Sequence, residues 1–122
     1  MCPRWQPAAL KDYMAHGMQH HPSEQHPQRH MLRFDRMVET QIYNTLPDNF
    51  ASWLRRHPLQ VPVAFIGGTE SKEIRQVGMD TTQRVTKGRV WMVPGGSHLF
   101  PLEQPDTTIA LADEALAAMM RA

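Results

Sequence analysis

The sequence has a single cysteine, Cys2, and no long hydrophobic run. One thiol cannot form an internal disulfide, which favours a reducing compartment. No uninterrupted apolar stretch approaches the roughly 20 residues that a membrane-spanning helix needs. The first 20 residues also lack the apolar core of a signal peptide. We therefore expect a cytoplasmic protein that does not enter a membrane.

The sequence also lacks an excess of charge of either sign. Its 13 Lys and Arg residues nearly balance 12 Asp and Glu residues, for a formal net charge of +1. Proteins that bind nucleic acid or anionic membranes usually carry a clear basic excess, so we expect neither partner. A length of 122 residues with 41% hydrophobic residues suits one small globular domain.

The sequence changes character near Pro58. Before it, residues 1–57 carry helical patterns joined by polar segments, and residues 19–30 are predicted to form a polar loop. The clearest helical pattern has apolar residues spaced four apart along one face, at Phe34, Val38, Ile42 and Leu46. Residues 1–57 are therefore expected to be helical.

Strand and helix patterns alternate in residues 58–122. Residues 61–66 and 90–93 are short apolar runs that end at glycine or proline, a pattern typical of buried strands. A helical pattern at residues 71–85 separates them, and another, with Asp106 as the expected N-cap, follows. This order predicts two parallel strands with a right-handed crossover. Because such strands need neighbours and helices on both faces, we expect the chain to hold the end of a larger sheet.

His98 is the residue that most suggests chemistry. It lies in the loop after the second predicted strand, beyond the break at Pro94-Gly95-Gly96. In open α/β sheets this end of the strands carries the active site, and histidine suits a base that works near neutral pH. No nucleophile is evident, because no serine is expected in a strand-to-helix elbow. The serines are Ser23, Ser52, Ser71 and Ser97.

Two motifs give the chain a family resemblance. They are Phe65-Ile-Gly-Gly-Thr-Glu-Ser71 and Pro94-Gly-Gly-Ser-His-Leu-Phe-Pro-Leu-Glu-Gln-Pro105. Together they resemble the C-terminal half of an α/β-hydrolase of the epoxide hydrolase and haloalkane dehalogenase group, and residues 34–47 resemble part of its helical cap. The resemblance implies an α/β fold in which residues 58–122 are the last two parallel strands and helices of the core. Residues 1–57 would be a cap-like segment.

The resemblance also implies an activity. His98 matches the catalytic base of enzymes that hydrolyse an ester, epoxide or carbon–halogen bond through a covalent intermediate. The family's acid would fall near Ser71, where Glu70 is the nearest carboxylate and Glu73 the next; some relatives take it from an earlier strand. The substrate would be small and apolar or aromatic, and no cofactor is predicted. Because the nucleophile and oxyanion hole lie upstream in the family, we expect this chain alone to be inactive.

Two other interpretations remain open at this point. The chain could be a small non-catalytic interaction protein that forms a homodimer or pairs with a separate N-terminal half. A metal site is the other, since five histidines fall between residues 16 and 30, namely His16, His20, His21, His26 and His30. His16 and His20 have the spacing of a helical ligand pair, but Gly17 would disrupt that helix. We therefore predict a solvated loop and no metal site.

Overall fold

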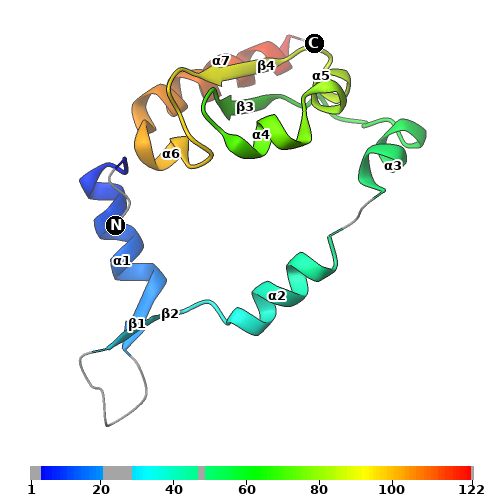
Figure 1. Ribbon diagram of the computed structural model, residues 1–122. Coiled ribbons are helices and arrows are strands. Elements are labelled where there is room, and N and C mark those ends of the chain that lie inside the picture. The colour runs from blue at the N-terminus through cyan, green and yellow to red at the C-terminus, as the bar shows by residue number, and fades with distance from the viewer. Residues whose placement is uncertain (1–3, 21–28, 47–48, 122) are drawn as a thin grey trace. The chain divides into compact units, whose positions relative to one another are not determined.

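The computed structural model describes residues 4–20, 29–46 and 49–121, which form a small mixed α/β protein (Figure 1). These residues contain seven helices and two two-stranded sheets, one antiparallel and one parallel. The chain divides into two compact units, Met1–Asp48 and Asn49–Ala122. No described helix is long and apolar enough to cross a membrane.

The first unit combines two helices with a short antiparallel pair of strands. Helix α1 spans Pro7–Gly17 and α2 spans Arg36–Asn44, while β1 (Met18–His20) pairs with β2 (His30–Leu32). The strands occupy the two ends of the segment predicted to be a polar loop, whose residues 21–28 lie outside the described part. Three-residue strands without apolar alternation leave no clear signal in a sequence, so this pairing was not predicted.

Local chemistry explains where these helices begin. Pro7 suits the first turn of α1 because its fixed φ fits the helix and its missing N–H would have no partner there. At α2, the Asp35 carboxylate accepts a hydrogen bond from the Met37 N–H at 2.8 Å. Of the four positions predicted to share an apolar helical face, Val38 and Ile42 lie on α2 and are 45% and 49% exposed, while Phe34 and Leu46 lie outside the helix.

The second unit contains the parallel pair. Its strands are β3 (Phe65–Gly68) and β4 (Val90–Val93), in register from Phe65 opposite Val90 to Gly68 opposite Val93. Its helices are α3 (Phe50–Arg56), α4 (Lys72–Val77), α5 (Asp80–Thr86), α6 (Phe100–Glu103) and α7 (Pro105–Met120). The predicted parallel pair with a helical crossover is thus confirmed, although β3 begins four residues later than the apolar run at 61–66 that predicted it and includes Gly67 and Gly68, which were expected to end it.

Two helix boundaries differ from the prediction. The single helix expected at residues 71–85 is divided into α4 and α5 because Gly78 adopts a φ of 80°, which ends the first helix. Helix α7 begins at Pro105, so Asp106 lies in its first turn and does not cap it. There the Asp106 carboxylate still favours the helix, through the partial positive charge at its N-terminus.

The core of the second unit is small. Helix α7 packs on both strands, and within the described residues only Val93 and Ala115 are buried hydrophobic side chains. On the same helix Ile109 and Leu116 are 61% and 53% exposed. The second unit therefore leaves apolar surface uncovered on α7, whereas the residues of β3 and β4 are buried or half-buried.

Gly68, at the end of β3, permits a close contact with the backbone of the loop that follows β4. A Cβ atom at this position would collide with the carbonyl oxygens of Gly96 and Ser97. These are backbone atoms of the loop that follows β4, so they cannot move aside as the end of a flexible side chain would. The approach of the two loops at this end of the sheet therefore requires glycine at position 68.

We predict that Gly68→Ala destabilises the protein by about 1–3 kcal/mol, the usual cost of forcing an extra methyl group into a packed site. Urea unfolding followed by circular dichroism measures the change. Gly17→Ala is the control, because a Cβ there meets only Tyr13 ring atoms at 3.6 Å or more. In a helix this change should be neutral or stabilising by up to about 1 kcal/mol. Equal effects of the two substitutions would contradict the proposed collision.

Candidate active site

The loops that follow β3 and β4 are joined by backbone hydrogen bonds. The Thr69 N–H donates to the Val93 carbonyl at 3.1 Å, and the Glu70 N–H donates to the Gly96 carbonyl at 2.9 Å. In the other direction, the Gly95 N–H donates to the Thr69 hydroxyl at 2.8 Å. These bonds hold the residues that follow the two strands next to one another, at the carboxyl ends of a parallel pair.

Ser71 is the N-cap of α4 and is almost completely buried, with 1% of its surface exposed. Its Oγ accepts from the Ile74 N–H at 3.3 Å and donates to Glu73 Oε2 at 3.0 Å. Both contacts are local and follow from the position of a serine at the start of a helix. Ser71 thereby holds the Glu73 carboxylate at the first turn of α4.

His98 meets these two residues from the other loop. Its Nδ1 lies 3.5 Å from Ser71 Oγ and 3.7 Å from Glu73 Oε2. The second distance is that of an ion pair, longer than a hydrogen bond. The side chains of His98 and Glu73 are 62% and 54% exposed, so solvent reaches both. Within the described part of the chain, no hydrogen-bond partner occupies Nε2 on the opposite side of the imidazole ring.

The surroundings of Glu73 favour its ionised form. Its own backbone N–H lowers the pKa of the carboxyl group most, and the Ser71 hydroxyl comes next. Partial loss of hydration acts in the opposite direction, while the charges of His98 and Lys72 lower the pKa further. Glu73 is therefore a carboxylate at neutral pH. Its negative charge suits it to attract the N–H at Nδ1 of His98 and to stabilise an imidazolium.

Glu103 fixes the loop on which His98 lies. Its carboxylate is buried, with Oε2 accepting from the Ser97 N–H at 3.0 Å and Oε1 from the Ser97 hydroxyl at 2.5 Å. Ser97 Oγ in turn accepts from the Leu99 N–H at 3.1 Å. The two charge-assisted bonds to Glu103 hold Ser97, immediately before His98, and the neutral bond from Leu99 holds the residue after it, so the backbone that carries His98 is restricted.

A cavity of about 240 Å³ adjoins the three side chains. Ser71, Glu73 and His98 contribute to its polar edge, and most of the remaining wall is apolar. The apolar side chains in that wall are Phe65, Ile66, Ile74, Val77, Met79 and Phe100. The cavity is small for a ligand site, and its chemistry suits an apolar group held next to the imidazole.

The two predicted site residues lie on adjoining loops. His98 is at the carboxyl end of β4, as predicted. Glu70 joins the His98 loop through its backbone, and its own carbonyl accepts from Arg75 at 3.2 Å. The carboxylate that contacts His98 Nδ1 is Glu73, the second choice in the sequence. The sequence did contain a signal for Glu73. A serine at the N-cap of a helix can reach a carboxylate two residues later with its hydroxyl, as Ser71 does with Glu73.

Ser71 follows the end of β3 by three residues and is the N-cap of α4. It is nevertheless unsuited to act as a nucleophile, because it is buried and its hydroxyl already caps the helix and bonds Glu73. Ser97 is occupied in the same way by Glu103.

The histidine segment is only partly described. Helix α1 ends at Gly17 and His20 belongs to β1, so His16 and His20 do not form a helical ligand pair. His20 and His30 face each other across β1 and β2 with ring centroids 4.6 Å apart. His21 and His26 lie outside the described residues. Among the residues that are described, no group of three or more potential metal ligands occurs.

We predict that Glu73 contributes to the acid sensitivity of folding. Because its folded-state pKa is lowered, its stabilising effect is complete above the ordinary glutamate pKa of about 4.3. That effect is lost as the pH falls through the lowered value. Glu73→Gln should remove this part of the pH dependence when urea unfolding is measured from pH 7 to pH 3. Glu114→Gln, the same change on an exposed face of α7, should retain it, and identical profiles for the two variants would refute the assignment.

Comparison of the chain with known protein families, with curated proteins and with solved structures finds no match. The resemblance to α/β-hydrolases therefore remains one of two sequence motifs.

Proposed function

We propose that Ser71, Glu73 and His98 form the base half of a hydrolase active site. His98 is the base, Glu73 is the acid that orients it, and Ser71 holds Glu73 in place. The observation that carries this proposal is the Glu73 carboxylate 3.7 Å from His98 Nδ1. A carboxylate on that side favours a proton on Nδ1 and leaves Nε2 able to accept one.

The reaction class follows from this arrangement and from the motif resemblance. An upstream serine attacks an ester and displaces its alcohol, or an upstream aspartate attacks the carbon of an epoxide or carbon–halogen bond and displaces the ring oxygen or the halide; either step forms a covalent ester intermediate. His98 Nε2 takes a proton, either from the serine or from the water that hydrolyses the intermediate. The resulting imidazolium is stabilised by Glu73 and returns its proton to the leaving group. The apolar wall of the adjoining cavity supports a small apolar or aromatic substrate.

The nucleophile and the oxyanion donors must come from outside the described residues. Ser71 and Ser97 are engaged in structural hydrogen bonds, and the other described serine, Ser52, lies on α3. In the described part of the second unit, β3 has β4 as its only strand partner. We infer that further strands, with a nucleophile at the same end, complete the sheet next to β3.

A second candidate is a non-catalytic interaction protein that dimerises or pairs with a separate half. The observation that favours it is the apolar surface of α7, where Ile109, Leu116 and Met120 are at least half exposed. A partner that covers this surface and pairs with a free strand edge would bury what the second unit leaves open. In this candidate His98 and Glu73 form only a surface ion pair.

The tautomer of His98 tests the first proposal on the chain as it stands. In ¹⁵N-resolved NMR of the neutral imidazole, we expect His98 to carry its proton on Nδ1. Glu73→Gln should shift the population toward the tautomer protonated on Nε2. Glu70→Gln is the matched control and should leave the tautomer unchanged. If Glu70→Gln alone moves the proton, the acid is Glu70; if neither does, no carboxylate orients His98.

The oligomeric state tests the second candidate. If this chain is an interaction protein that pairs with itself, sedimentation velocity at micromolar concentration should show one species of twice 14.0 kDa. Leu116→Glu should dissociate it, because a charge would then be buried in the interface. Glu114→Lys, on the same helix, changes charge without altering an apolar side chain and should leave the dimer intact. A monomer, or a heterogeneous aggregate, would count against this candidate.

A further inference from the structure

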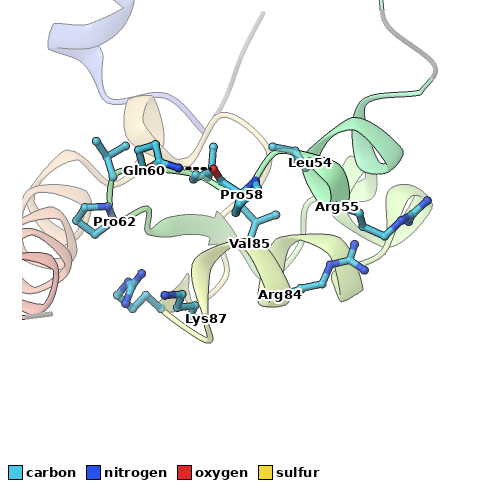
Figure 2. Close-up of a pocket in the computed structure, with 11 residues that line it drawn as sticks. Leu54, Arg55, Pro58, Gln60, Pro62, Arg84, Val85 and Lys87 are labelled. Atoms are coloured by element: carbon cyan, nitrogen blue, oxygen red, sulfur yellow. Dashed lines mark hydrogen bonds between the residues drawn. The ribbon is translucent and has the colours of Figure 1, made fainter.

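A larger cavity, of about 630 Å³, lies in the second unit away from His98 (Figure 2). Its wall comes from residues 54–62, which precede β3, and from residues 84–89, which precede β4. Ser71 and His98 follow those strands. Since β3 and β4 are parallel, the segments that line this cavity and the loops that carry Ser71 and His98 lie at opposite ends of the strands, and the two cavities share no lining residue.

The wall of this cavity is strongly basic. Arg55, Arg84, Lys87 and Arg89 line it, and no aspartate or glutamate does. Figure 2 shows the side chains of Arg55 and Arg84 reaching toward the same end of the cavity, with Lys87 toward the other. A chain with a net charge of only +1 thus places four of its cations around one hollow.

The four cations are not neutralised by neighbours. Among the described residues, none of them forms an ion pair with a carboxylate. Arg84 donates to the Thr81 hydroxyl at 3.2 Å and Arg89 donates to the Val63 carbonyl at 3.1 Å. Both partners are uncharged, so the positive charge remains. Arg55 and Lys87 make no side-chain hydrogen bond in the described part of the chain and remain able to bind a ligand.

The rest of the wall is apolar. Its side chains are Leu54, Pro58, Leu59, Val61, Pro62 and Val85. The volume lies within the range of about 300–1,000 Å³ that is usual for small-molecule sites. Guanidinium groups bind phosphate and carboxylate oxygens with two hydrogen bonds at once. A ligand that matches this wall has an anionic head and a short apolar body.

The backbone at Lys87 departs from what the residue type prefers. Lys87 follows α5 in the left-handed conformation, with a φ of 53°, where glycine is usual. The next N–H, that of Gly88, donates to the Gln83 carbonyl at 2.9 Å and closes the end of the helix. Glycine would fit this turn better, so Lys87→Gly removes the ammonium group from the cavity without a cost to the fold.

We propose that this cavity binds a small organic anion whose phosphate or carboxylate head contacts the arginines and Lys87 and whose apolar body lies against Leu54, Leu59 and Val85. The site is separate from the proposed hydrolase site and does not depend on it.

Isothermal titration calorimetry with hexyl phosphate tests the proposal. Inorganic phosphate, which has only the anionic head, and hexanol, which has only the apolar body, are the control ligands. Hexyl phosphate should bind at least about tenfold more tightly than either, and less tightly as salt is raised. Lys87→Gly should weaken binding about fivefold, as for loss of one charged contact, with an unfolding midpoint unchanged or higher. Lys72→Ala removes a cation from α4, outside this cavity, and should bind as the unaltered chain does.

Three results would overturn the proposal. Equal affinity for hexanol and hexyl phosphate would mean that the cations do not select the ligand. Equal affinity of the Lys87→Gly and Lys72→Ala variants would mean that only the net charge matters. Amide NMR shifts on titration that fall around Ser71 and His98, and not around residues 84–89, would place the ligand in the other cavity.

Discussion

The close contact of Gly68 with the backbone of Gly96 and Ser97 is the constraint on which the rest of the candidate site depends. It brings the ends of β3 and β4 so near that the following loops exchange backbone hydrogen bonds. Only then do Ser71 and His98, separated by 26 residues in the chain, come within 3.5 Å. A side chain at position 68 would separate the loops and remove the ion pair between Glu73 and His98.

Burial explains why the second unit suits a larger assembly better than an independent fold. Two short strands and one packed helix exclude little apolar surface from water, and only Val93 and Ala115 are fully buried apolar side chains among the described residues. Small domains already bury a lower fraction of their surface than large ones. Both candidate functions would cover the exposed apolar surface of the second unit, the hydrolase through further strands and the interaction protein through a partner. They differ in whether the covering segment also carries a nucleophile.

The two ends of the parallel pair have different chemistry. At the carboxyl ends, a histidine and an ionised glutamate adjoin a small, mostly apolar cavity. At the opposite ends, four cations line a larger one, and none of them pairs with a carboxylate among the described residues. Strand polarity accounts for the separation, since every loop that precedes a strand of a parallel pair lies at one end and every loop that follows lies at the other. One short pair of strands can therefore carry two independent sites.

The sequence by itself determined the features that depend on local pattern. Two apolar runs, one ending at glycine and the other at proline, predicted the parallel pair. The position of His98 after the second run predicted that it lies at the carboxyl end of the strands. The tertiary structure decided the rest. The β1–β2 pairing, the division of one helix at Gly78 and the choice of Glu73 beside His98 depend on backbone conformation and on contacts between distant residues. The basic cavity is the clearest case, because its cations belong to separate segments that become neighbours only when the chain folds.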